Sequence, residues 1–251
     1  MKELLKCAID IGEQMLICGA EVHRVEDSIS RMCRAFGAER IDVFIITSSM
    51  VVTLYTREGE SYTQTRRING TGTDIEKLHQ LNQLSRKICQ EKMSAEAIQK
   101  ELAQCESSRP YPFWAVSVCY ALIACAFTAF FGGTGREIFV SPFVGFVTSF
   151  VTRISERVET NKILEKFICS FLVTVCAFLF MKTGCISSVD KVIIGNIMTL
   201  IPGIGLTNAI RDLFVGDSIA GLLRSVEAGL NALAIGAGYF LFVLMMGGAL
   251  S

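Results

Sequence analysis

The sequence predicts an α-helical membrane protein, in which an N-terminal α+β domain in the cytosol precedes about five transmembrane helices. The first observation is charge: residues 1–110 contain 15 Lys or Arg and 16 Asp or Glu, whereas residues 111–251 contain only 9 and 8. The second is an uncharged stretch of 26 residues, because about 20 apolar residues span a bilayer as a helix. The third is helical and strand-like periodicity in the first part. We expect a cytosolic domain over residues 1–110 and a transmembrane domain over residues 111–251.

Two amphipathic helices are predicted at the start of the chain, over residues 3–17 and 21–36. In both, apolar residues recur every three or four positions, and polar residues occupy the other faces. Gly19 follows the first helix and Gly37 follows the second. Glycine commonly follows a helix end, so these positions support the two boundaries.

Three runs rich in Ile, Val, Thr and Tyr come next, over residues 40–47, 50–56 and 61–68. This composition with short turns between the runs predicts an antiparallel meander of three strands. Two further helices are expected, the first capped by Thr73 or Asp74 and the second by Ser94. A short polar linker with prolines follows them, and the domain boundary is expected there, near residue 110.

Uncharged stretches mark five expected spans, at residues 110–135, 138–152, 167–181, 192–210 and 228–251. The second and third stretches each have 15 residues, which is too short for a hydrocarbon core of about 30 Å at 1.5 Å per residue. Both therefore need flanking Arg or Lys side chains that reach out to the interface. The fourth span is expected to be broken at Pro202-Gly203, because proline removes a backbone donor and clashes with the preceding turn.

Positive charge predicts the orientation in the membrane. With the N-terminus inside, six Lys or Arg residues lie in inside loops (Arg153, Arg157, Lys162, Lys166, Arg211 and Arg224) and three in outside loops (Arg136, Lys182 and Lys191). Asp10 and Glu13 interrupt any apolar core of a secretory signal. We expect a multi-pass protein of the cytoplasmic (inner) membrane of the cell, with the N-terminus in the cytoplasm and the C-terminus outside.

Composition argues against several classes of function. The net charge is zero, so a basic surface that binds nucleic acid is not predicted. The ten cysteines lack a C-x-x-C pair or other zinc-site spacing, and no metal or cofactor is expected. Gly70-Thr-Gly72 lacks the length and the lysine of a phosphate-binding loop, which leaves ATP-driven transport unsupported. Cys18 and His23 leave a Cys–His hydrolase as a weak alternative.

The most unusual stretch is residues 201–227, where a helix break lies beside five charged residues. Broken helices and ionisable groups at membrane depth often mark a transport path. The candidate residues for a substrate or ion path are Asn196, Pro202, Gly203, Asn208, Arg211, Asp212, Asp217, Gly221, Arg224 and Glu227. Arg224 and Glu227 are spaced to pair on one helix. The alternative is a kinked helix followed by an interfacial connector with surface ion pairs.

Two groups of residues resemble the threonine/serine exporter family. They are Gly19-Ala-Glu-Val-His-Arg-Val-Glu26 with Arg67 and Asp74, and Pro202-Gly203 with Asn208, Arg211-Asp212, Gly216-Asp217, Ser218, Gly221, Arg224 and Glu227. The resemblance covers nearly the whole chain in order, and the chain length is similar to that of the larger half of the split exporters. His23 departs from the family pattern, in which a small hydroxyl residue is expected.

The resemblance implies a subunit of a secondary transporter and not an enzyme. Such a transporter exports threonine and serine, or a dicarboxylate such as succinate, together with a small membrane partner subunit of similar fold. The remaining alternatives are a membrane-anchored sensor or scaffold and a membrane-bound hydrolase. The polar domain could gate the path, recruit the partner or sense the metabolite.

Overall fold

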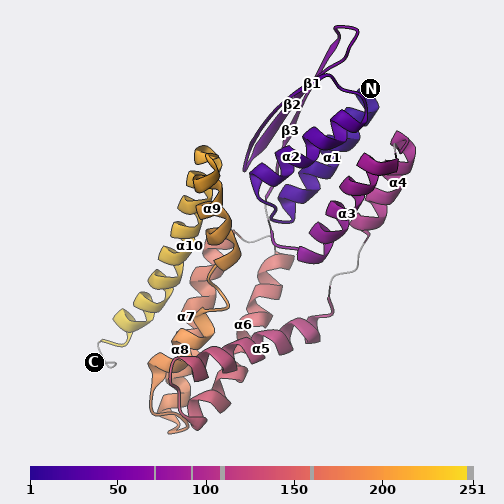
Figure 1. Cartoon of the computed structure of the whole chain (residues 1–251). Coiled ribbons are helices and arrows are strands. Elements are labelled where there is room, and N and C mark those ends of the chain that lie inside the picture. Colours follow the sequence, from indigo (N-terminus) through magenta and orange to yellow (C-terminus); the bar gives the residue numbers. More distant parts are fainter. Residues whose placement is uncertain (71, 92, 108–110, 159–160, 248–251) are drawn as a thin grey trace. The chain divides into compact units, whose positions relative to one another are not determined.

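The computed structural model describes residues 1–70, 72–91, 93–107, 111–158 and 161–247 (Figure 1). The predicted fold class is confirmed, since helices with a three-stranded sheet precede long apolar helices. The chain forms two compact units. The first comprises Met1–Arg109 together with Gly203–Val226, and the second comprises Pro110–Pro202 and Glu227–Ser251. The segment that follows the predicted helix break therefore packs with the N-terminal residues.

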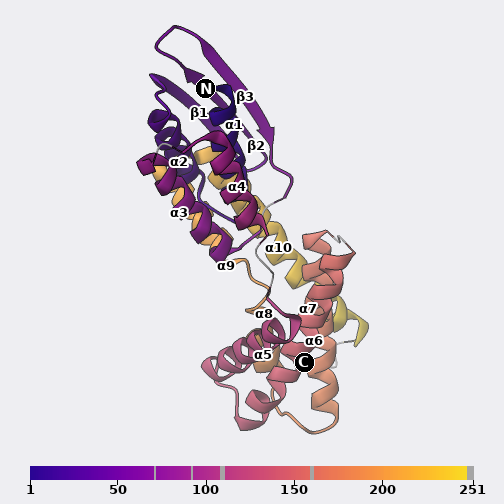
Figure 2. The same cartoon turned by 90° about the vertical axis from the view of Figure 1, so that its right-hand side faces the viewer.

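The first unit has three layers. Its elements are α1 (Lys2–Ile17), α2 (Val22–Ala35), β1 (Arg40–Ile46), β2 (Ser49–Tyr55), β3 (Ser61–Arg67), α3 (Ile75–Glu91), α4 (Ala95–Glu106), α9 (Gly203–Val215) and the start of α10 (Ser218–Met245). The strands pair antiparallel in the order β1-β2-β3, as predicted. The helices α1 and α2 lie between the sheet and the pair α3 and α4 (Figures 1 and 2).

Alternation along β2 builds the core of this unit. Met50, Val52 and Leu54 are completely buried, whereas the residues between them are partly exposed. Burial of one such aliphatic side chain contributes roughly 1.5–3 kcal/mol. The two central helices approach closely at Gly12, where a Cβ atom would lie 2.6 Å from Ile29 Cδ1. This packing fixes the turn between α1 and α2.

The second unit contains α5 (Phe113–Phe130), α6 (Gly135–Arg157), α7 (Lys162–Lys182), α8 (Val189–Ile197) and the later part of α10. In the described part of the chain, four helices are long and apolar enough to cross a membrane, namely α5, α6, α7 and α10. The protein is therefore a multi-pass membrane protein. Both views show α6 and α7 side by side (Figures 1 and 2).

The expected fourth span, residues 192–210, consists of two short helices instead of one. The helices α8 and α9 have 9 and 13 residues, and at 1.5 Å per residue both are shorter than a hydrocarbon core of about 30 Å. The N–H of Leu200 bonds to Ile197 O at 2.8 Å, which closes the end of α8. Pro202 has no N–H to continue the helix. Of the about five expected spans, four are single helices that are candidate spans in the described part of the chain.

The second and third expected spans are longer than their uncharged stretches. The helices α6 and α7 have 23 and 21 residues, because helical structure continues through the charged residues at their ends. At 1.5 Å per residue, about 20 residues suffice to cross the core. Both helices are therefore long enough to cross the core, and the prediction that these spans are too short is wrong.

Small residues allow the helices of the second unit to approach closely. A Cβ atom on Gly145 of α6 would lie 2.9 Å from Tyr120 O of α5. A Cβ atom on Gly238 of α10 would lie 2.4 Å from Phe167 O of α7. Replacement of either glycine would therefore push two helices apart.

Candidate functional site

The turn between α1 and α2 presents two backbone carbonyl groups to the rest of the first unit. Gly19 has a φ of +91°, and a Cβ atom there would lie 2.6 Å from Gly72 O. Glycine adopts this left-handed conformation readily and also provides the space. Glu21 is extended and serves as the N-cap of α2. The carbonyl groups of Gly19 and Ala20 accept hydrogen bonds from α9 and α10.

Three polar side chains from α9 and α10 bind this turn. Asn208 Nδ2 donates to Gly19 O at 3.0 Å, and Arg224 Nη2 donates to Ala20 O at 2.8 Å. Arg211 forms an ion pair with Glu21. The structure thus brings members of both groups that carry the family resemblance into one set of contacts. We call Asn208, Arg211, Asp212 and Arg224, with residues 19–22, the turn network.

Asp212 is the buried centre of the turn network. Its Oδ2 lies 3.1 Å from Arg224 Nη1, and the two side chains are 1% and 11% exposed. The carboxylate also accepts from the N–H of Val22, the first residue of α2, where the helix dipole favours negative charge. Burial is the largest cause that raises the pKa of Asp212, and the charges of Asp217 and Glu21 add to it, whereas Arg224 and the Val22 N–H lower this pKa. The ion pair therefore depends on both partners staying in place.

A close hairpin of α9 and α10 positions these donors. Gly216, between the two helices, has a φ of +106°. A Cβ atom on Gly221 would lie 2.7 Å from Leu213 Cγ and 2.9 Å from Ala209 O. Gly221 therefore acts through close packing. Asp217 follows Gly216 and lies near two side chains of α2.

Three other candidate residues from the stretch 201–227 lie outside the turn network, namely Pro202, Gly203 and Glu227. Pro202 precedes α9, and Gly203 is the first residue of that helix, where its carbonyl accepts from Thr207 Oγ1 at 2.9 Å. Glu227 is exposed. The pairing of Arg224 with Glu227 that their spacing suggested is not formed, because Arg224 instead binds Asp212 and the α1–α2 turn.

Asn196 belongs to a separate polar cluster in the second unit. This residue of α8 is completely buried, and its Nδ2 donates to Ser141 Oγ and Val192 O, both at 2.9 Å. Ser141 of α6 lies 2.7 Å from Thr128 Oγ1 of α5 and donates to Ala124 O. Three helices thus contribute polar side chains to one buried position.

The side-chain oxygen of Asn196 is the unusual atom of this cluster. It has no hydrogen-bond partner among the residues that the structure describes. The carbonyl of Val192 can only accept a hydrogen bond, so the Asn196 atom that faces it must be the amide nitrogen. The atom without a partner is therefore Oδ1. A buried acceptor without a partner costs about 1–3 kcal/mol. The buried Oδ1 of Asn231, in α10, likewise has no hydrogen-bond partner among the described residues.

Sequence reasoning found Asn196 by its depth in an apolar stretch but did not identify Thr128 or Ser141. Hydroxyl residues in membrane helices commonly bond to their own backbone, so their presence in an apolar stretch is a weak signal. Glu137 was also missed. Its buried carboxylate accepts from the N–H groups of Ser187 and Ser188 at 2.9 and 3.1 Å, and this anchors the segment after α7 to the start of α6.

The geometry weighs against Cys18 as a nucleophile. Cys18 is 3% exposed, and burial raises the pKa of its thiol. The thiolate that attacks a substrate is therefore disfavoured.

Comparison with known proteins gives a family and two relatives. The family model "Putative threonine/serine exporter" (ThrE) matches residues 6–246. The "Probable succinate transporter subunit YjjP" of Klebsiella aerogenes is 23% identical over 244 residues, which cover 97% of this chain and 92% of the relative. The Escherichia coli K12 protein of the same name is 22% identical over 247 residues, which cover 98% and 96%. No solved structure matches the chain.

Proposed function

The chain belongs to the threonine/serine exporter family, and we propose that it is the larger subunit of a secondary transporter that exports a small polar metabolite. The observation that carries this proposal is the extent of the family match, because residues 6–246 include both compact units. Threonine and serine are the first substrate class. The names of the two relatives support a dicarboxylate such as succinate as the second.

We propose that a small membrane subunit of similar fold completes the transporter. Support comes from the word "subunit" in the names of both relatives. Many large apolar side chains on α5, α6 and α10 are exposed in the isolated chain. Lipid and a second membrane protein are the two environments in which such surfaces are stable.

We assign Asn196 to the path of the substrate or of a coupling cation. The unpartnered Oδ1 is an acceptor that a hydroxyl group, an ammonium group or a cation can satisfy. Polar groups inside a membrane unit are costly and are commonly functional. An acceptor also fits the hydroxyl and ammonium groups of threonine and serine better than it fits a dicarboxylate.

A second role is proposed for the turn network, which is to hold the segment 203–226 against the cytosolic part of the chain. Arg211, Asp212 and Arg224 bind groups of the first unit. Their charges are thereby paired or hydrogen-bonded within the first unit. This assignment makes them positioning residues for the start of α10.

The same packing supports five crossings of the membrane. With α5, α6 and α7 taken as three crossings, for which they are long and apolar enough, residue 183 lies on the side of the membrane opposite the N-terminus. Residues 203–226 belong to the first unit again, so residues 183–202 must return across the membrane even though α8 alone is too short. The helix α10 then makes the last crossing. With the N-terminus in the cytoplasm, the C-terminus lies outside.

The test is an export assay in cells that carry both subunit genes, loaded with threonine-containing dipeptides or with succinate. Deletion of the gene for this chain should reduce efflux of one of the two metabolites. Asn196→Leu should reduce the same efflux at unchanged membrane abundance. The matched control is Thr174→Val, because the buried Thr174 hydroxyl bonds within its own helix, to Ser170 O at 2.9 Å.

Unchanged efflux of both metabolites after deletion would support the sensor or scaffold alternative and would overturn the proposed function. Normal efflux in Asn196→Leu, with deletion still harmful, would instead remove only Asn196 from the path. Asn231 would then be the next amide to test.

A further inference from the structure

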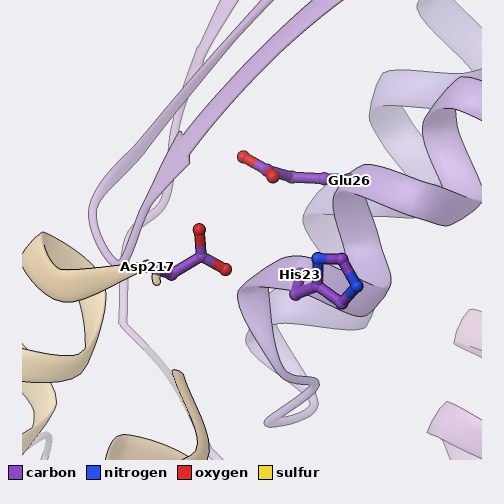
Figure 3. A group of neighbouring side chains, drawn as sticks. All are labelled: His23, Glu26 and Asp217. Carbon is purple, nitrogen blue, oxygen red and sulfur yellow. The ribbon is translucent and has the colours of Figure 1, made fainter. Parts of the chain in front are cut away.

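Three potential metal ligands meet where α2 lies beside the turn between α9 and α10. His23 and Glu26 are three residues apart on α2 and therefore share one face of that helix. Asp217 comes from the α9–α10 turn. One ligand atom from each residue lies within 4.8 Å of the other two. Figure 3 shows His23 and Glu26 extending from the helix on the side where Asp217 approaches.

Among the residues that the structure describes, neither carboxylate of this group forms an ion pair with Lys or Arg, although the charge of His23 lowers the pKa of Glu26. Glu26 Oε1 accepts from the N–H of Ile45 at 3.1 Å, and Asp217 Oδ2 is buried without a hydrogen-bond partner in the described structure. The pKa of Glu26 is raised, first by burial and then by the charge of Asp217. Arg211, from α9, pairs with Glu21. The arrangement therefore holds negative charge that a cation would neutralise.

The dimensions suit a single transition-metal ion. Such ions bind nitrogen and carboxylate oxygen at about 2.0–2.2 Å, so two ligands on one ion are at most about 4.4 Å apart. Separations within 4.8 Å thus require only small side-chain movements. The imidazole ligand suits Fe²⁺ or Zn²⁺ and the two carboxylates suit Mn²⁺, whereas Mg²⁺ and Ca²⁺ prefer sites made of oxygen alone. The hydrogen bond from Ile45 orients Glu26, as outer contacts do in metal sites.

We propose that His23, Glu26 and Asp217 form a binding site for one divalent transition-metal ion, which fastens the α9–α10 turn to α2. The ion would have three protein ligands and would complete its coordination with water. It would replace repulsion between two carboxylates by attraction to a shared cation. Because α10 begins directly after Asp217, metal occupancy would fix the start of the last membrane helix. The site depends on His23, a residue that departs from the family pattern.

Metal binding is tested on the full chain purified in detergent and stripped with EDTA. Mn²⁺ is the probe, because the ten cysteines would bind Zn²⁺ through thiolates. Loss of the free Mn²⁺ signal in electron paramagnetic resonance measures binding. We expect one Mn²⁺ per chain and a rise in melting temperature on addition of Mn²⁺.

Variants test the ligands. His23→Gln and Asp217→Asn should each weaken Mn²⁺ binding by about tenfold or more, since even outer-shell changes cost 10–100-fold. His79→Gln is the matched control, because His79 is the only other histidine and is exposed on α3, beside Gln83. His23→Asp retains a ligand at the same position and should keep measurable binding. It shows that loss in His23→Gln is a loss of ligation and not of folding.

Absence of Mn²⁺ binding to the wild-type chain would overturn the proposal. Wild-type affinity in His23→Gln or Asp217→Asn, or equal loss in His79→Gln, would also overturn it. None of these measurements uses export, so they decide the metal site independently of the transport function.

Discussion

Replacing Asp212 with alanine should release residues 203–226 from the α1–α2 turn. The substitution removes the ion-pair partner of Arg224 and the acceptor of the Val22 N–H. Removal of one partner from a buried pair costs about 3–5 kcal/mol, because the other charge is left uncompensated. Arg224 retains its bond to Ala20 O and is 11% exposed, which favours the lower end of that range.

A cost of about 3 kcal/mol corresponds to a change of roughly 150-fold in the local opening equilibrium, since 1.36 kcal/mol is tenfold. Hydrogen exchange followed by mass spectrometry measures this opening in peptides from residues 203–226. Exchange there should accelerate by about two orders of magnitude. Exchange in β2, whose alternate residues are buried in the core, should stay unchanged.

Two further variants serve as controls for Asp212→Ala. Asp212→Asn retains an acceptor for both donors, and burial already raises the pKa of Asp212, so this variant should exchange much more slowly than Asp212→Ala. Asp27→Ala removes an exposed pair with Arg31 on α2, which contributes only about 0–1 kcal/mol. Exchange of residues 203–226 within about threefold of wild type in Asp212→Ala would refute the positioning role. Equal acceleration in β2 would refute it as well, because the effect would then be global.

Three other predictions follow from the same contacts. Burial raises the pKa of Asp212 and Glu26 above their ordinary values of 3.8 and 4.5. Protonation of these carboxyl groups therefore favours the folded state. In metal-free buffer, protection of α9 amides from hydrogen exchange should be greatest at a pH below the ordinary pKa values, and it should fall as the pH rises through the raised pKa values. Protection that increases over this pH range contradicts the reasoning. Gly221→Ala should destabilise the α9–α10 hairpin by about 1–3 kcal/mol, because its Cβ atom would meet a backbone carbonyl at 2.9 Å; a thermal unfolding midpoint equal to wild type counts against it. In intact cells, an impermeant thiol reagent should label a single-Cys185 variant and spare a single-Cys89 variant, since both thiols are exposed and lie on opposite sides in the proposed topology; equal labelling argues against that topology.

Local patterns predicted most of the fold because the relevant interactions are short in sequence. The period of apolar residues identified α1 and α2, and Gly19 and Gly37 marked their ends. Alternation and turns identified the meander. The helix break was visible at Pro202, although its consequence was not, because a single residue does not show which unit the following segment joins.

The turn network could not be predicted as a set of contacts. Asn208 and Arg224 meet the α1–α2 turn across 189 and 204 residues of sequence, and periodicity carries no information over such distances. The spacing of Arg224 and Glu227 suggested a pair within one helix, but the buried carboxylate of Asp212 offers the stronger partner. Asn196 was recognised by its position in an apolar stretch, whereas its partners come from two other helices.

The charges of residues 201–227 admit two explanations, and the contacts favour one of them. Ionisable groups are expensive inside a bilayer, and that cost made these residues candidates for a transport path. Gly203–Val226 belongs to the first unit, where Arg211 and Arg224 bind Glu21, Asp212 and a backbone carbonyl. The charges of Arg211, Asp212 and Arg224 are therefore explained without a substrate. The unpartnered oxygen of Asn196 has no such explanation within the described chain, so the search for the transported molecule begins there.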